Sequence, residues 1–250
     1  ALKGVPMRTR AASNPGGAVA DPTRAMSITN TIVPCAPIVR FKRPVLSVWG
    51  VGDSTIQNNS QAPEGLSAWG MRACADVSTT GRPVVWANLG ASSRNFSEYW
   101  AVAEAYLAAG VPAPSVLLVE AASINDAGAS VTQRTQELHL AQAARVLAIA
   151  RQYNIPYVVF APLLPYNVLN LAADTIRKDT NAKIAAMAAS NGCTALVLDA
   201  LGDSATPQRW VATYNDGTGA AGDGIHPDET AFDEVMAPAF AAILRHIIGA

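Results

Sequence analysis

Five short apolar runs, spread over most of the chain, constrain its fold more than any other feature. Each has the length of a β-strand, and most of them do not alternate apolar with polar residues. This pattern is typical of strands that are buried on both faces, as in a parallel sheet. The runs span residues 45–49, 84–89, 116–119, 157–160 and 195–198.

Helical patterns lie between these runs. Apolar residues recur with helical spacing over 96–107. Ser130 and Gln133 have the spacing of a capping box, which predicts a helix over about 130–152, and a further helix is expected over 174–190. Because strands and helices alternate, we expect a parallel sheet that is covered by helices on both sides.

The C-terminal end carries one more helical stripe. Apolar residues recur from Phe232 to Ile247, and Pro238 lies inside this stretch. A proline in a helix interior removes a hydrogen bond and clashes with the preceding turn, so we expect Pro238 to kink or split this helix. His246 lies among the apolar residues of the stripe, where we expect a packing or surface role.

Length and composition favour one domain. The chain has 250 residues, of which 50% are apolar and only 15% charged. This suits a well-buried α/β domain, which we place at 44–250. Residues 1–43 are rich in Pro, Gly, Ala and Thr and show little periodicity, so we expect an N-terminal arm or linker there. The first residue is Ala1, which suggests a processed or excised chain.

The charge pattern excludes some classes of partner. The formal net charge is -1, and no cluster of Lys and Arg is present to neutralise a nucleic acid backbone. No apolar stretch approaches the roughly 20 residues that span a bilayer. We therefore expect a soluble protein. Its oligomeric state and compartment stay open, and secretion or membership of a larger extracellular assembly is compatible with the sequence.

The three cysteines indicate neither a metal nor a redox site. Cys35, Cys74 and Cys193 are far apart and form no CxxC pair. Structural thiols are the simplest interpretation. A disulfide between Cys35 and Cys74 stays open for an exported chain, although one cysteine would then be unpaired.

Polar motifs follow the predicted strands. Gly52-Asp53-Ser54 follows the first strand, Asn88-Leu89-Gly90 ends the second, and Ser123-Ile124-Asn125-Asp126 follows the third. Asp223-Gly224-Ile225-His226 follows the fifth strand after a long loop. In open α/β sheets, ligands bind at the carboxyl ends of the strands. We therefore expect these motifs to converge at one edge of the sheet.

These residue types suit ester hydrolysis by a serine. Ser54 would attack the carbonyl, His226 would take its proton and return it to the leaving alcohol, and Asp223 would hold the imidazole. The tetrahedral oxyanion needs donors that already point toward it. The candidates are the backbone N–H groups of Ser54 and Gly90 and the side-chain amide of Asn125. This chemistry needs no cofactor and no metal.

In this order, the four motifs resemble the four blocks of the SGNH hydrolases, also called GDSL-type esterases. The resemblance implies a flavodoxin-like, three-layer α/β/α fold with a central five-stranded parallel sheet. It also implies the triad Ser54, Asp223 and His226 and the oxyanion hole of Ser54, Gly90 and Asn125. The third block usually reads Gly-x-Asn-Asp, and the present chain has Ser123 in place of that glycine.

Other residues compete for these roles. A second Gly-Asp-Ser at 202–204 has no later oxyanion motif, so Ser204 is better interpreted as part of a turn. His139 shares a helical face with Gln136 and Gln142 and is expected to be solvated. Glu120 ends an apolar strand, where we favour a hydrogen-bonded structural carboxylate over a catalytic one.

Two aromatic residues in the long loop of residues 200–222 are candidate substrate contacts. Trp210 and Tyr214 lie in this glycine-rich segment, and long loops beside a site are often functional. Their rings would stack on a sugar or line an acyl pocket.

The function predicted from the sequence is a serine esterase for short acyl groups, with acetyl esters of carbohydrates favoured. The substrate would be a small-molecule or glycan ester. A lipid esterase or thioesterase for longer chains is the alternative within hydrolases. A noncatalytic carbohydrate-binding or structural module of a larger assembly is the alternative from another class, motivated by the N-terminal arm.

Overall fold

The computed structural model describes residues 44–57, 68–128, 131–166, 169–206, 209–215 and 224–249. The predicted N-terminal arm and Asp223 lie outside the described residues. None of the described helices is long and apolar enough to cross a membrane.

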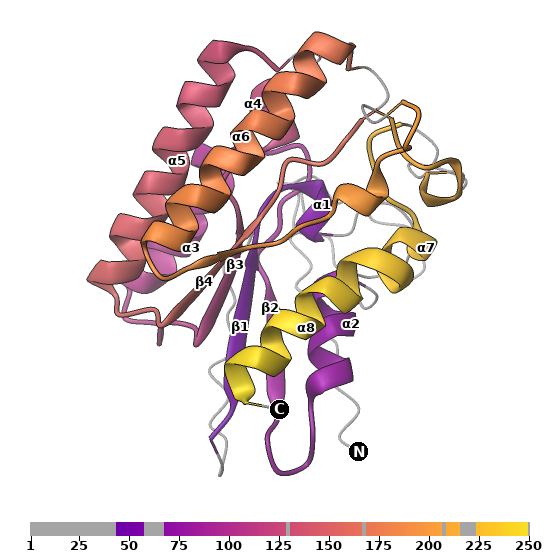
Figure 1. Cartoon of the computed structure of the whole chain (residues 1–250). Coiled ribbons are helices and arrows are strands. Elements are labelled where there is room, and N and C mark those ends of the chain that lie inside the picture. Colours follow the sequence, from indigo (N-terminus) through magenta and orange to yellow (C-terminus); the bar gives the residue numbers. More distant parts are fainter. Residues whose placement is uncertain are drawn as a thin grey trace, which may run out of the picture. The chain divides into compact units, whose positions relative to one another are not determined.

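A five-stranded parallel sheet forms the centre of the domain (Figure 1). All four strand pairs are parallel, and the order across the sheet is β2-β1-β3-β4-β5. The prediction of a central five-stranded parallel sheet is therefore confirmed. The strands are β1 (Leu46–Val51), β2 (Val84–Asn88), β3 (Val116–Glu120), β4 (Tyr157–Ala161) and β5 (Thr194–Ala195).

The last strand is shorter than the sequence predicts. The apolar run over 195–198 suggested a full strand, but β5 ends at Ala195. Leu196 still donates its backbone N–H to the carbonyl of Phe160 at 2.8 Å, after which the chain turns into a 3-10 helix at Asp199. Leu196 and Leu198 nevertheless stay buried, so the apolar run continues into the core without a ladder.

Helices cover both faces of the sheet. On one face α2 (Trp69–Val77) packs along α8 (Ala237–Ile248), and α3 (Phe96–Ala108), α5 (Gln133–Gln152) and α6 (Leu171–Ser190) lie on the other (Figure 1). Right-handed crossovers produce this division, because the chain crosses toward β2 in one direction and toward β3, β4 and β5 in the opposite direction.

Side chains that alternate along β1 fill both interfaces. Val48 belongs to the core that contains α2 and α8. Its neighbour Trp49 meets Tyr106 of α3 edge-on, with ring centroids 6.2 Å apart. This is the three-layer α/β/α arrangement that was predicted.

Capping side chains fix where the helices on the second face begin. Asn95 and Glu98 form a capping box at the start of α3. The predicted box at Ser130 and Gln133 is wrong, because Thr132 caps α5 and pairs with Thr135. Helix α6 begins three residues before the predicted start, since the side chain of Asn170 accepts the N–H of Ala173.

The C-terminal helix is interrupted just before Pro238, as expected. The chain forms the short α7 (Glu229–Ala231), a π-helical turn over Phe232–Met236, and then α8. Pro238 lies in the first turn of α8, where a missing N–H costs least. His246 lies at the exposed surface of α8.

Cys74 belongs to α2, and its free thiol is buried in the core that α2 shares with α8. Burial raises its pKa to about 12, so the thiol is protonated and unreactive. The disulfide to Cys35 that the sequence left open is therefore not formed at Cys74, and Cys35 itself lies outside the described residues.

His139 is buried, which corrects the expectation of a solvated side chain. Its exposed fraction is 0%, and Gln136 and Gln142 on the same face are buried as well. This face of α5 packs against polar neighbours: the amide of Gln142 donates to Asp126 and that of Gln136 to Thr180. Both ring nitrogens of His139 have no hydrogen-bond partner among the described residues. Burial lowers the pKa of His139, and the charge of Asp126 and the backbone of Ser123 offset only part of this effect.

We predict that His139→Leu flattens the acid side of the stability profile. The folded protein keeps His139 neutral, while the unfolded chain takes up a proton below about pH 6.5, so wild-type stability falls as pH drops through this range. The variant should gain about 1 kcal/mol at pH 8 because two unpaired nitrogens are removed, and more at pH 5. Urea unfolding at the two pH values measures this. An equal gain at both would show that His139 does not titrate differently in the folded state.

Candidate active site

The Gly52-Asp53-Ser54 motif forms a tight turn between β1 and the short helix α1 (Ser54–Gln57). Close packing explains the glycine. A Cβ on Gly52 would lie 2.3 Å from Oε2 of Glu120 and 2.4 Å from Cγ1 of Ile56. The turn is thus pressed against the end of β3, and Ser54 stands at the carboxyl edge of the sheet.

Ser54 and His226 meet at this edge. The Oγ of Ser54 and the Nε2 of His226 are 2.7 Å apart, although 172 positions separate the two residues in the sequence. Ser54 is only 5% exposed. A hydroxyl at this distance can pass its proton to a neutral imidazole that carries its own proton on Nδ1. Asp223, predicted to hold Nδ1, lies outside the described residues and stays a prediction.

A small network holds the loop that carries His226. The side chain of Asn215 donates to the carbonyl of His226 and accepts the N–H of Gly224 at 2.9 Å. The indole of Trp210 donates to the carbonyl of Gly224 at 3.2 Å, and Gly224 adopts a φ of 79° that favours glycine. No sequence pattern indicates the role of Asn215, because only the folded loop brings its two partners together.

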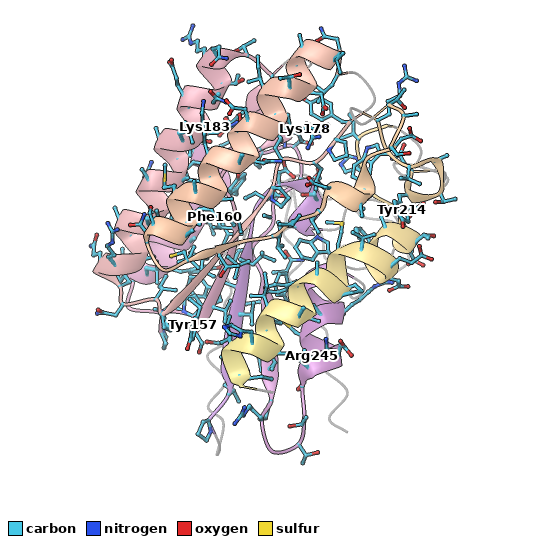
Figure 2. The ribbon with its side chains drawn as sticks, in the orientation of Figure 1. Tyr157, Phe160, Lys178, Lys183, Tyr214 and Arg245 are labelled. Carbon is cyan, nitrogen blue, oxygen red and sulfur yellow. The ribbon has the colours of Figure 1, made fainter. Side chains whose placement is uncertain are left out.

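Trp210 and Tyr214 differ from one another in exposure. Trp210 is 4% exposed and packs in the core with α8. Tyr214 lies near the beginning of α7 (Figure 2), is partly exposed, and its hydroxyl lies 3.2 Å from a carboxylate oxygen of Glu234. Substrate contact by either ring stays a prediction.

The backbone N–H groups of the candidate oxyanion donors differ in whether they already have a hydrogen-bond acceptor. The N–H of Ser54 has no acceptor among the described residues, as expected for the first residue of a helix. The N–H of Gly90 instead donates to Oδ1 of Asn88 at 2.9 Å. Glycine at position 90 is explained by packing, since a Cβ there would lie 2.4 Å from the backbone nitrogen of Gln57.

The amide of Asn125 is held at the same edge. Its Nδ2 donates to the carbonyl of Arg94 at 2.9 Å and lies 3.4 Å from Oδ2 of Asp53. Ser123, which replaces the usual glycine of this motif, caps the following turn by accepting the N–H of Asn125 at 3.1 Å. Its hydroxyl also donates to Asp53 at 2.8 Å. The serine therefore supports the turn before Asn125.

Ser93 is a feature of this edge that the sequence did not reveal. It has a φ of 60°, in the left-handed region that is rare for residues other than glycine. The flanking N–H groups of Ser92 and Arg94 are bonded to Gln57 and Ala91, whereas that of Ser93 has no acceptor among the described residues. A free backbone donor is therefore present in the loop next to Asn125.

The second Gly-Asp-Ser forms an ordinary turn. Oδ1 of Asp203 accepts the N–H groups of Ala205 and Thr206, at 2.8 and 2.7 Å, and Ser204 is exposed. This confirms the interpretation of Ser204 as a turn residue.

A small pocket adjoins the nucleophile turn. Apolar side chains form much of it, together with the carboxyl groups of Asp53 and Glu120. Its apolar lining includes Ile124, Leu163, Leu164 and Ile225. Ile124 and Ile225 are the chain neighbours of Asn125 and His226, so the pocket lies beside the candidate catalytic groups.

A scan of the sequence against protein families finds no match, and neither does a search of curated proteins. Solved structures with the same fold are nevertheless found. A GDSL-like lipase from Bacteroides thetaiotaomicron matches with a TM-score of 0.53 and 16% identity, over 82% of this chain and 88% of that one.

Two similar structures bear the names of esterases that act on acetylated polysaccharide fragments. An acetyl xylan esterase matches with a TM-score of 0.56 and 15% identity, over 79% of this chain and 99% of that one. An acetyl-xylooligosaccharide esterase from Geobacillus matches with a TM-score of 0.55 and 14% identity, over 79% and 92%. Identities this low show the shared fold and no more. The chain has the fold of the SGNH, or GDSL-type, hydrolases.

Proposed function

We propose that this protein hydrolyses esters of short acyl groups through an acyl-enzyme on Ser54. The observation that carries the proposal is the 2.7 Å contact between Ser54 and His226 at the carboxyl edge of the sheet. Serine is a weak nucleophile unless a neighbouring base takes its proton, and this contact supplies the base.

The reaction has two steps. Ser54 attacks the ester carbonyl while His226 takes the hydroxyl proton, and His226 then protonates the departing alcohol. Water, activated by the same imidazole, releases the acid and restores Ser54. Asp223 is proposed to orient His226 through Nδ1.

Three groups are proposed to receive the oxyanion: the N–H of Ser54, the amide of Asn125, and a backbone N–H from the loop after β2. The N–H of Gly90 could serve only after breaking its hydrogen bond to Asn88. The N–H of Ser93 has no acceptor among the described residues and is the alternative. Catalytic hydrogen bonds are often completed only when substrate binds, so the Asn125 amide is proposed to exchange one of its present acceptors for the oxyanion.

The favoured substrate is an acetyl ester, with a carbohydrate as the alcohol. The small pocket next to the nucleophile turn includes the branched side chains of Leu163 and Leu164 in its lining, and its small size supports a short acyl group. Two proteins of the same fold are named as acetyl xylan and acetyl-xylooligosaccharide esterases. This resemblance supports, at the level of fold, an acetylated glycan as substrate.

We expect a fluorophosphonate probe to label the wild-type protein and Ser204→Ala, but not Ser54→Ala. The probe reacts only with a serine that a base activates. Labelling can be followed by mass spectrometry of the intact chain. A wild-type protein that takes no label would favour the noncatalytic binding module, and labelling that persists in Ser54→Ala would assign the nucleophile elsewhere.

Replacing Asn125 by Ala should lower the turnover number by roughly 10²–10³, the usual loss for one oxyanion donor. The Michaelis constant should change much less, because the oxyanion forms only in the transition state. Steady-state kinetics with p-nitrophenyl acetate measures both. An unchanged turnover number would remove Asn125 from the site.

A series of p-nitrophenyl esters from acetate to decanoate should show the highest kcat/KM at acetate and a decline beyond butyrate. The small size of the pocket next to the nucleophile turn, which Leu163 and Leu164 help to line, is the reason for this expectation. A rate that rises with chain length beyond butyrate would instead identify a lipid esterase or thioesterase.

A further inference from the structure

Two carboxyl groups are buried together beneath the nucleophile turn. Glu120, the last residue of β3, is 4% exposed, and Asp53, next to Ser54, is 1% exposed. Within the described part of the chain, no Lys, Arg or His forms an ion pair with either side chain. A buried carboxylate pair without a cation is costly, so this arrangement needs a physical reason.

Glu120 holds the backbone of the turn. Its Oε2 accepts the N–H of Asp53 at 2.7 Å, and its Oε1 bonds to the hydroxyl of Thr55. The same carboxyl occupies the space that a side chain at Gly52 would need. Glu120 therefore contacts the residues on both sides of Ser54.

The Asp53 carboxyl contacts the third motif, which contains the candidate oxyanion donor Asn125. Its Oδ1 accepts the N–H of Thr55 at 3.0 Å. Its Oδ2 accepts the hydroxyl of Ser123 at 2.8 Å and lies 3.4 Å from Nδ2 of Asn125. Hydrogen-bond donors therefore meet both oxygens of the Asp53 carboxyl.

The two acids have different surroundings. Burial raises the pKa of Glu120 well above its usual range, and the charge of Asp53 raises it further. The hydroxyl of Thr55 and the N–H of Asp53 oppose this only in part. Tyr99 faces Glu120 from α3 and donates its hydroxyl to the Glu120 carbonyl at 2.7 Å, and burial keeps this phenol protonated by raising its pKa. The negative charge of Asp126 also raises the pKa of Tyr99.

We propose that Glu120 is a positioning residue that acts in its protonated form. It shares one proton with Asp53 and so leaves Asp53 as the single anion that orients Ser123 and Asn125. The nucleophile turn and the oxyanion donor are thereby linked through one buried acid pair. The positioning role rests on the proposed function, whereas the shared proton does not.

The shared proton makes a prediction about stability alone. The unfolded chain releases the proton of Glu120 above its usual pKa, about 4.3, while the folded protein keeps it. Raising the pH therefore favours the unfolded chain until the raised pKa of the folded protein is passed. Relative to Glu120→Gln, which has no such proton, the wild-type folding equilibrium constant should fall by up to about tenfold per pH unit.

Urea unfolding of wild type and Glu120→Gln between pH 5 and 9 tests this. Glu137→Gln, at an exposed position of α5, is the matched control for the loss of one carboxyl and should show no such trend. If the ratio of the wild-type to the Glu120→Gln folding equilibrium constant stays constant with pH, the shared proton is overturned. A Glu120→Gln protein that does not fold would overturn it too, since a neutral amide of the same shape should be accepted.

Labelling rates with the fluorophosphonate probe test the positioning role. Glu120→Ala should be labelled at least tenfold more slowly than wild type, and Glu120→Gln should recover most of that loss. Asp53→Asn should lose rate without such recovery, because an amide would turn a donor toward Thr55, Ser123 or Asn125. The reverse pattern, with Asp53→Asn tolerated and Glu120→Gln impaired, would place the proton on Asp53 and overturn the assignment. If wild type takes no label, the proposed function fails while the stability result still decides the shared proton.

Discussion

The parallel pairing of β1 with β3 is the constraint on which the rest of the site depends. In this register Gly50 lies opposite Leu118 and Val51 opposite Val119. The residue after Val119 is Glu120, so the end of β3 reaches the turn that follows β1. Every contact between the nucleophile turn and the third motif follows from this alignment, because parallel strands end at the same edge.

The sheet positions only half of the candidate catalytic pair. Ser54 begins a helix directly after a buried strand, and this turn is held by Glu120 of β3 and by the indole of Trp69 of α2. His226 belongs to a segment without regular structure and is held by Asn215 and by Trp210 through Gly224. The 2.7 Å contact thus joins a rigid element to a loop whose geometry depends on side-chain hydrogen bonds. Asn215, which bonds to the backbone of this loop and not to the imidazole, therefore helps to hold His226 in place.

Much of this architecture was predictable from the sequence, and the exceptions have physical causes. Strand identity followed from apolar runs, and the meeting of Ser54 with His226 followed from element order. His139 was misassigned because a helix with polar residues on one face normally exposes that face, whereas here Asp126 and Thr180 supply buried partners for Gln142 and Gln136. Whether the Gly90 N–H is bonded depends on the rotamer of Asn88. The left-handed conformation of Ser93 depends on a loop that has no periodic pattern. No local pattern encodes either.

Ser123 shows how one departure from a common motif can involve several neighbours. A glycine at this position would leave Asp53 with one donor fewer and the turn before Asn125 without its cap. The serine hydroxyl supplies both interactions at once, donating to Asp53 and accepting the N–H of Asn125. A hydroxyl has a single proton, so it can serve both partners only if Asp53 acts as the acceptor. Ser123 therefore depends on Asp53 as the acceptor of its only proton, and a protonated Glu120, as proposed above, would leave both oxygens of Asp53 available as acceptors.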